Sequence, residues 1–220
     1  MTEAQRKPNA RTRATRSRLV ATAEQLFAER GVAAVSLNEI TRAAKQKNRN
    51  AVHYHFGSKE ALLEAIFQKH WEPIADRRRE MVTDLPDQPS IEQIASILVE
   101  PVAARFEDPD GGLAYIKISA ELAASNLLNF QGQGEDADYG PLHHDLWLPH
   151  LAHLPPAVRE HRMSLVVGML FHSLADHAIY RESQSVALAD TRLMVSNLVD
   201  AICAVLRAPV SKSTRALIDS

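Results

Sequence analysis

The segment of this chain with the most chemistry is NAVHYHFGSKEALL, residues 50–63. It places two histidines, a tyrosine and a lysine close together, and KQKNRN just before it supplies Lys47, Asn48 and Arg49. Lysine and arginine bind phosphates, arginine also binds guanine, and asparagine binds adenine. The pattern therefore predicts a surface that binds double-stranded DNA.

Short helices are expected to position these side chains. Apolar residues at helical spacing predict a first helix over residues 12–30. Ser36 and Glu39 have the spacing of a capping box at the start of a second helix. A third helix is predicted over residues 50–56, and Ser58 has the right position to cap a fourth. In a helix-turn-helix the second helix of the motif enters the major groove, so residues 50–56 are the expected recognition helix.

The charge distribution agrees with a DNA-binding end. The 220 residues carry a net charge of −2, yet residues 1–60 hold 12 Lys and Arg against 5 Asp and Glu, a balance of +7. Residues 61–220 hold 13 against 22, a balance of −9. Phosphate binding needs only the first part to be basic. The arginines from Arg6 to Arg18 are interpreted as a polar arm that follows the backbone or enters a minor groove.

The rest of the chain has helical periodicity and no alternating strand pattern. Further helices are predicted from residue 59 toward 81, with an end or kink near Pro73, and over 91–106, 113–130, 142–151, 157–181 and 186–207, with a polar connector at 131–141. The expected fold is all-α, with a three-helix head (residues 1–57) joined through the fourth helix to a larger helical body (residues 58–208). Residues 209–220 are predicted to be a flexible tail.

Residues 15–63 resemble the DNA-binding domain of the TetR family of bacterial transcriptional regulators. The resemblance is carried by AEQLFAERGVAAVSLNEITRAA, residues 23–44, and YHFGSKEALL, residues 54–63. The turn before the third helix is one residue longer than the commonest one, as in a subset of the family with an AVHYHF-like helix. His53 stands where a phosphate-binding tyrosine is usual; if it contacts a phosphate, protonation would strengthen DNA binding between about pH 6 and 7. The predicted DNA-binding residues are Ser36, Asn38, Lys47, Asn48, Arg49, Asn50, Ala51, His53, Tyr54, His55 and Lys59.

The resemblance also implies a homodimer formed by the last two long helices and a small-molecule site in the centre of the body. Candidate dimer residues are Met163, Val167, Leu170, Leu174, Leu193, Asn197 and Asp200. Candidate pocket residues are Ile97, Tyr115, Ile118, Leu122, Trp147, Leu151, Phe171 and His172. Ordinary core packing is the alternative for both sets, because helices that are apolar beyond one stripe must bury more than one face.

The expected function is a ligand-responsive transcriptional regulator, a repressor released from a palindromic operator by a small molecule. An activator and a DNA-binding protein without regulation are the alternatives. The chain has no GxSxG, P-loop, GxGxxG or zincin motif, so neither an enzyme nor a cofactor is expected.

The remaining features predict a cytoplasmic protein without bound metal. No apolar run reaches the roughly 18 residues of a membrane span. Cys203 is the only cysteine, which excludes an intrachain disulfide, and it is predicted to be buried. His150 with His153, and His172 with Asp176, share helix faces, but without an HExxH motif or a supporting cysteine no metal site is predicted.

Overall fold

The computed structural model describes residues 10–124, 144–182 and 190–218. All regular structure in these segments is helical, which confirms the predicted all-α class. The helices are α1 (Ala10–Arg30), α2 (Leu37–Ala43), α3 (Ala51–Phe56), α4 (Lys59–Thr83), α5 (Ile91–Ala103), the 3₁₀-helix η1 (Ala104–Glu107), α6 (Gly112–Ala124), α7 (His144–Leu151), α8 (Pro156–Glu182), α9 (Thr191–Arg207) and α10 (Lys212–Ile218). The predicted connector 131–141 and parts of the predicted helices 113–130, 142–151 and 186–207 lie outside the described residues.

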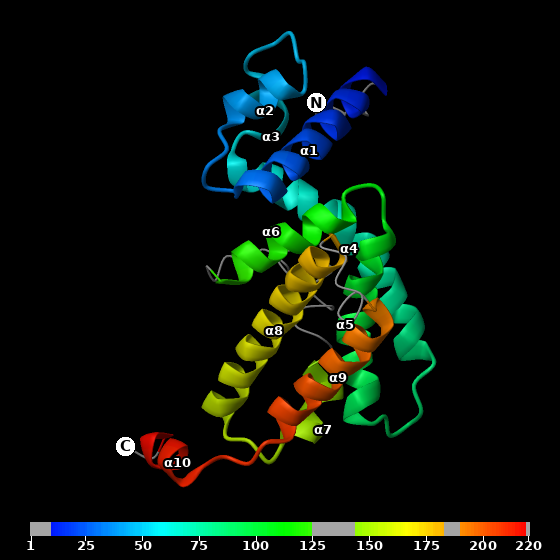
Figure 1. Cartoon of the computed structure of the whole chain (residues 1–220), viewed down its shortest axis with the longest axis vertical. Helices are drawn as coiled ribbons and strands as arrows, with labels where there is room; N and C mark the ends of the chain where they lie inside the picture. The colour runs from blue at the N-terminus through cyan, green and yellow to red at the C-terminus, as the bar shows by residue number, and fades with distance from the viewer. Residues whose placement is uncertain (1–9, 125–143, 183–189, 219–220) are drawn as a thin grey trace, which may run out of the picture.

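The head, α1 to α3, forms a small bundle at one end of the molecule (Figure 1). Its interior is apolar, with Leu19, Phe27, Ile40 and Val52 at most 1% exposed. Burial of such side chains stabilises the bundle by roughly 1.5–3 kcal/mol each.

The Ser36 and Ser58 hydroxyls cap α2 and α4 as the sequence predicts, but the predicted capping box at Ser36 and Glu39 has only its serine half. The Ser36 hydroxyl accepts a hydrogen bond from the Glu39 amide at 3.3 Å, and Ser58 does the same for Ala61 at 3.2 Å. The Glu39 carboxylate pairs with Arg30 of α1, and this hydrogen bond holds the pKa of Glu39 below its ordinary value. The pair therefore links the end of α1 to the start of α2.

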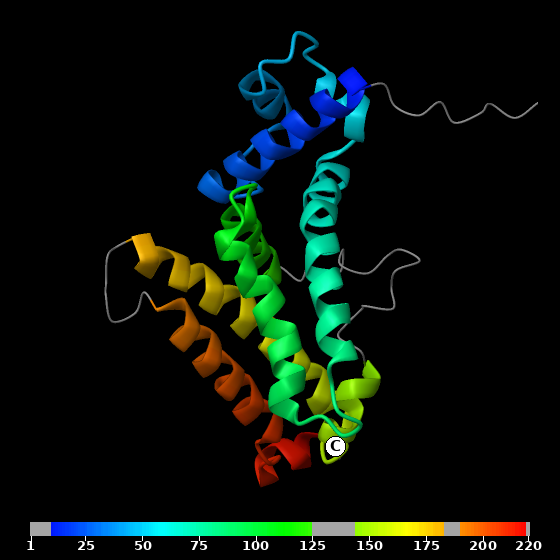
Figure 2. The same ribbon diagram turned by 90° about the vertical axis from the view of Figure 1, so that its right-hand side faces the viewer.

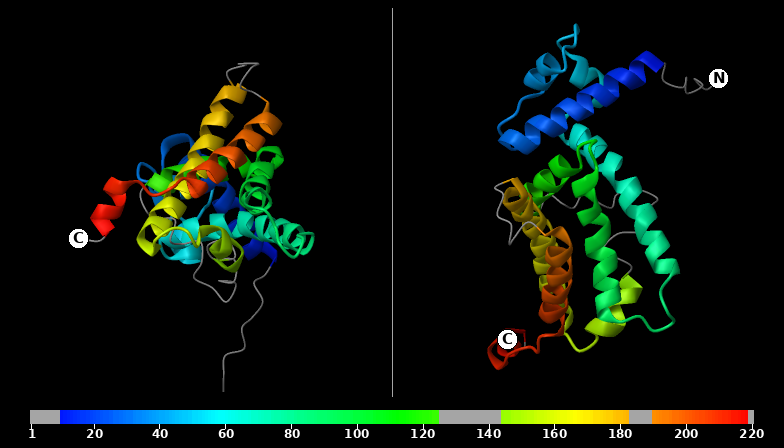
Figure 3. Two further views of the ribbon diagram at one scale, coloured as in Figure 1. Left: turned by 90° about the horizontal axis from the view of Figure 1, so that it is seen from below. Right: turned by 45° about the vertical axis from the view of Figure 1, so that its right-hand side comes forward.

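The body is built of packed helices that run away from the head. Figures 2 and 3 show α4 on one side, α8 and α9 on the opposite side, and α5 and α6 between them. α6 also contacts α1, so two helices of the body reach the head. The predicted end or kink near Pro73 does not end α4, which continues to Thr83. α5 passes Pro101 and ends two residues later, where η1 begins.

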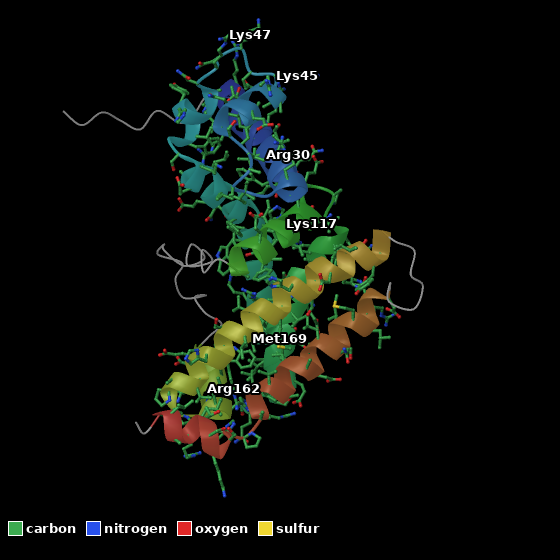
Figure 4. The ribbon with its side chains drawn as sticks, turned by 60° about the vertical axis from the view of Figure 1, so that its left-hand side comes forward. Arg30, Lys45, Lys47, Lys117, Arg162 and Met169 are labelled. Atoms are coloured by element: carbon green, nitrogen blue, oxygen red, sulfur yellow. The ribbon has the colours of Figure 1, made fainter. Side chains whose placement is uncertain are left out.

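Arg162 of α8 holds the C-terminal end of α9. Arg162 of α8 donates hydrogen bonds to the carbonyls of Leu206 and Pro209, both at 3.3 Å, and so satisfies the end of α9. Figure 4 shows Arg162 at the end of the molecule away from the head. Residues 212–218, expected in the flexible tail, form the helix α10, although none of its residues is buried.

Two further expectations concern membranes and the cysteine. Within the described segments no single helix is long and apolar enough to cross a membrane; only α9 and α10 together, bent by 61°, reach that length and composition. Cys203 is buried as predicted, and this burial raises the pKa of its thiol.

Candidate DNA interface and body site

The turn that leaves α2 has a left-handed residue that is not glycine. Lys45 has φ 52°, and the amides of Lys45 and Gln46 donate to the carbonyls of Arg42 at 3.0 Å and Thr41 at 3.2 Å. This is a Schellman arrangement, for which glycine is the usual left-handed residue. Lysine there costs about 1–2 kcal/mol of backbone strain. The strained position presents a cation at the tip of the head, next to Lys47 (Figure 4).

The start of α3 is organised by an asparagine. Asn48 Oδ1 accepts a hydrogen bond from the Asn50 amide at 2.9 Å, and the Asn48 carbonyl accepts from the Ala51 amide at 3.1 Å. The Asn48 side chain therefore helps to satisfy the free N–H groups at the start of α3. Lys47, Arg49 and Asn50 are exposed around it.

α3 separates its residues between core and solvent. Ala51 is 3% exposed and packs in the head, so its predicted contact with a thymine methyl is wrong. His53 and Tyr54 are exposed, Tyr54 at 77%. His53 Nδ1 donates to the Gly57 carbonyl at 3.0 Å, which leaves Nε2 as the ring nitrogen facing outward. A neutral imidazole with this tautomer offers Nε2 only as an acceptor, so it binds a phosphate only after protonation.

His55 is held against α1 by an arginine that the sequence interpretation placed in the polar arm. Arg16 Nη1 donates to the His55 carbonyl at 3.0 Å, and its guanidinium lies 4.3 Å from the centre of the Phe56 ring. Arg16 is thus part of α1 and contacts α3, so its assignment to a separate polar arm is wrong. Burial, and secondarily the charge of Arg16, lower the pKa of His55.

The other predicted residues lie at the starts of helices. Ser36 and Asn38 are exposed at the start of α2. Lys59 is half-buried at the start of α4 and donates from Nζ to the Val32 carbonyl at 2.9 Å. An ammonium has three N–H groups, so this bond still leaves Lys59 donors for a phosphate.

The exposed face from the α2–α3 turn through α3 has one sign of charge. The sequence between Ala43 and Gly57 contains Lys45, Lys47 and Arg49 and no aspartate or glutamate. No local carboxylate competes with DNA phosphates for these cations, which is the electrostatic condition for nucleic-acid binding.

With this geometry in place, the comparisons identify the head. Residues 19–66 match the family of bacterial regulatory proteins, tetR family. The match covers the buried residues of α1, all of α2 and α3, and the start of α4. The chain is therefore a DNA-binding transcriptional regulator and not an enzyme, with a tetR-type head.

Two solved structures are similar to most of this chain, with low sequence identity. A crystal structure of a TetR-family regulator from Streptomyces coelicolor A3 is 21% identical with a TM-score of 0.45, and covers 94% of this chain and 100% of its own. The crystal structure of RolR without ligand is 20% identical with a TM-score of 0.38, and covers 89% of this chain and 98% of its own. The identification of the head depends on the match of residues 19–66 alone.

A buried polar cluster joins the head to the body, and the sequence interpretation missed it. Glu24 of α1 is 2% exposed and accepts from Lys69 Nζ of α4 at 2.8 Å and from the His70 ring. Lys69 also pairs with Asp110 at 2.9 Å. On its other side, His70 Nδ1 lies 3.7 Å from a carboxylate oxygen of Asp108. The cluster links α1, α4 and the turn before α6.

A second contact and a glycine complete this junction. The Val32 amide, just after α1, donates to the Glu121 carboxylate of α6 at 3.0 Å. Gly111 has φ 86°, and a Cβ there would lie 2.1 Å from the Glu24 carboxylate. Only glycine fits both the left-handed backbone and the close approach of Glu24.

The predicted pocket residues lie in the core of the body, with one exception. Seven of them are at most 4% exposed: Ile97, Tyr115, Ile118, Leu122, Trp147, Leu151 and Phe171. His172 is exposed, and its Nδ1 donates to the Gly168 carbonyl at 3.0 Å, so its assignment to an internal pocket is wrong. The core also contains Arg78 of α4, a charged residue that the sequence interpretation left out.

Two hollows are lined wholly by residues of the described segments. One, of about 670 Å³, lies between α5, η1 and α9, and the other, of about 310 Å³, lies between the end of α8 and the start of α9. Neither is lined by a predicted pocket residue, whereas Leu193 and Asn197, predicted in the dimer interface, line the smaller one.

The predicted dimer residues divide between the two sides of α8 and α9. Leu170 and Leu174 are 2% and 0% exposed within the protomer, so their assignment to an interface with a second copy is wrong. Leu193, Asn197 and Asp200 of α9 are exposed, and Met163 and Val167 of α8 are half-buried.

The histidines of the body do not gather around a common point. His153 Nδ1 donates to the His150 carbonyl at 3.1 Å. Across the segments that the structure describes, no three His, Cys, Asp or Glu side chains are placed to hold one metal ion.

Proposed function

We propose that this protein is a homodimeric repressor that binds an approximately palindromic operator and is released by a small molecule held in its body. The observation that carries the proposal is the exposed surface from Lys45 to Tyr54, where cations and hydrogen-bonding side chains occur without a local carboxylate. This surface lies in the part of the chain that matches tetR-family regulators. Repression follows most simply, because occupation of a promoter needs only DNA binding.

The outer side of α8 and α9 supports the dimer. No described helix covers it (Figure 2). Leu165 and Ile179 of α8 and Leu193 of α9 are 61%, 57% and 62% exposed. A Cβ at Gly168, between them on α8, would contact nothing within 4 Å, so a second helix has room to approach. Large exposed apolar side chains in one patch are typical of an interface.

A two-fold axis through this patch would place two copies of α3 on one side of the dimer. Their separation is expected to be about 34–36 Å, one turn of DNA, which requires a palindromic site. A ligand that prefers the dimer with the wrong separation then weakens DNA binding, and DNA weakens ligand binding by the same factor.

The test is selection of binding sites from random DNA, followed by fluorescence anisotropy and light scattering. We expect an inverted repeat, a dimer at micromolar concentration, and specific binding at least roughly 10³-fold tighter than non-specific binding. Leu165→Glu should give monomers with weak operator binding, whereas Leu217→Glu, at an exposed leucine of α10, should keep the dimer. A wild-type monomer, or no enriched sequence, would contradict the proposal.

A further inference from the structure

Three consecutive arginines of α4 have different environments. Arg77 donates to Glu80 at 3.0 Å and Arg79 pairs with Asp76, and both arginines are exposed. Arg78 between them is 6% exposed. It follows His70 and Ile74 at intervals of four residues, so it lies on the face of α4 that packs into the body.

Arg78 has no carboxylate partner in the described part of the chain. Its Nε donates to the Ile97 carbonyl at 3.4 Å and its Nη2 to the Leu98 carbonyl at 3.5 Å, both long for hydrogen bonds. A guanidinium has five N–H groups, so three of them have no acceptor among these contacts. A buried charge without a counter-ion destabilises a protein, because the interior solvates it poorly.

A purely structural role for Arg78, as a hydrogen-bond donor to α5, would not require its positive charge. Pro101 has no N–H, so the Ile97 carbonyl, four residues earlier in α5, lacks its helical donor. Arg78 Nε donates a long hydrogen bond to this carbonyl in place of the missing helical donor. A neutral donor would serve equally well, so the carbonyl does not account for a full positive charge in the core.

Aromatic side chains lie near the Arg78 guanidinium. Its guanidinium lies 5.6 Å from the centre of the Trp71 ring. Burial lowers the pKa of Arg78, and the negative charge that Tyr115 carries when ionised opposes this effect. Ser119, one helical turn after Tyr115, is completely buried, and its hydroxyl has no hydrogen-bond partner among the described residues. Such a site suits a ligand with an apolar ring and one acidic group.

We propose that Arg78 is an anion receptor that binds the carboxylate of a small aromatic acid in the core of the body. The ring of the acid would pack against Trp71 and Tyr115, and its carboxylate would receive the guanidinium N–H groups that do not donate to the Ile97 and Leu98 carbonyls. Arginine binds carboxylates strongly, since two parallel N–H groups match the two oxygens. The inference extends the proposed function, because it gives the chemical class of the effector.

A short chain of contacts connects this position to the head. The Tyr115 ring stacks on His70 with ring centres 4.7 Å apart, and His70 binds Glu24 of α1. An anion that moves Arg78 or Tyr115 thus acts on the polar cluster that joins α1 to α4. The acid would bias the orientation of the head through this junction.

Thermal unfolding of the purified dimer tests the receptor without knowledge of the operator. The variants are Arg78→Met, which keeps length and removes charge, and Arg77→Met as the matched surface control. Without ligand, Arg78→Met should raise Tm by about 2–4 °C, since it removes a buried charge that has no counter-ion among the described residues. Arg77→Met should leave Tm within about 1 °C of the wild type, as surface substitutions do. A structural role predicts the opposite, a lower Tm for Arg78→Met than for Arg77→Met, and that result would overturn the inference.

The second arm adds benzoate or phenylacetate, each paired with its neutral amide at equal concentration. We expect the acids to raise Tm of the wild type and of Arg77→Met, the amides to have no effect, and Arg78→Met to lose the response to acids at least about tenfold in apparent Kd. Equal effects of acid and amide, equal responses in Arg78→Met, or no acid-dependent shift in the wild type would each overturn the inference.

Fluorescence anisotropy with operator DNA tests the repressor proposal separately from the anion receptor. If no specific DNA is bound, the repressor proposal fails while the thermal shifts still decide the receptor. If DNA is released only by neutral or cationic compounds, and equally from Arg78→Met, the repressor proposal stands and the anion receptor fails.

Discussion

The α2–α3 turn and the junction of α1 with α4 contain the same kinds of polar side chain in opposite settings. In the turn, Lys47 and Arg49 are exposed, with no carboxylate nearby in the sequence. In the junction, Lys69 and His70 converge on the buried carboxylate of Glu24. Side chains of the turn are available to a partner molecule, whereas those of the junction hold two parts of the protein together.

The difference has an energetic consequence. Exposed ion pairs contribute little to stability, about 0–1 kcal/mol, so a protein loses little by leaving surface cations unpaired. Loss of one partner from a buried pair costs about 3–5 kcal/mol, because the other charge stays buried. Substitutions in the turn should therefore change DNA binding at nearly constant stability, and substitutions in the junction should change stability first.

The largest effect is expected at Glu24. Glu24→Ala leaves Lys69 and the buried His70 without their shared acceptor, and should lower the free energy of unfolding by about 3–5 kcal/mol. Urea unfolding at a fixed protein concentration measures this loss. Glu29→Ala, on the exposed side of the same helix, should stay within about 0.5 kcal/mol of the wild type. Equal losses for the two variants would remove the contrast between turn and junction.

Next in size is the effect of the turn on DNA binding. Arg49→Ala should weaken operator binding by about 1–3 kcal/mol, roughly 5- to 150-fold, if it binds a guanine as its position predicts. Its unfolding free energy should match that of the wild type. Arg77→Ala, an exposed arginine of α4 paired with Glu80, serves as the control. Anisotropy that shows the same affinity for Arg49→Ala and Arg77→Ala would exclude Arg49 from the interface.

A smaller effect of mixed sign is expected at Lys45. Lys45→Gly removes the strain of the left-handed backbone and should stabilise the protein by about 0.5–1 kcal/mol, after the greater freedom of glycine in the unfolded chain is subtracted. If Lys45 also binds a phosphate, the slope of log affinity against log salt should fall by about 1. Lys47→Gly has no such strain to relieve, so a gain in stability there would count against this explanation.

The smallest effect concerns pH. Since the pKa of His55 is lowered in the folded head, the unfolded chain takes up this proton first as the pH falls. The contribution of His55 to stability is therefore complete above about pH 6.5 and is lost as the pH falls toward the lowered pKa. His55→Gln should make the unfolding free energy depend less on pH below about pH 6.5. An unchanged slope in His55→Gln would show that Arg16 and burial leave this ring unaffected.

Local patterns were sufficient for most helices and for the solvent exposure of most predicted DNA-binding residues. Ser36, Ser58 and Gly57 mark helix ends through interactions within a few residues, which a sequence shows directly. The wrong predictions concern residues whose role depends on which side of the helix their side chain faces. Ala51 is one position past an exposed asparagine and faces the core, and Leu170 and Leu174 belong to the inner stripe of a helix whose outer stripe also contains leucine.

The polar residues with the most specific environments were missed for a common reason. The sequence DRRRE reads as a solvated charged run, and two of its arginines are indeed exposed. The spacing of Arg78 from Ile66, Phe67, His70 and Ile74 was the available signal, since four-residue steps continue the buried face of α4.

By itself the sequence determined the class of fold, the position of the basic head and the chemistry of its exposed turn. These depend on periodicity, capping and charge, which are local properties. Only the tertiary structure decided that Glu24, His70 and Arg78 are buried, and that Glu24 meets residues about 45 positions away in α4. Burial and pairing of polar groups depend on which helices pack together, and no spacing along one helix contains that information.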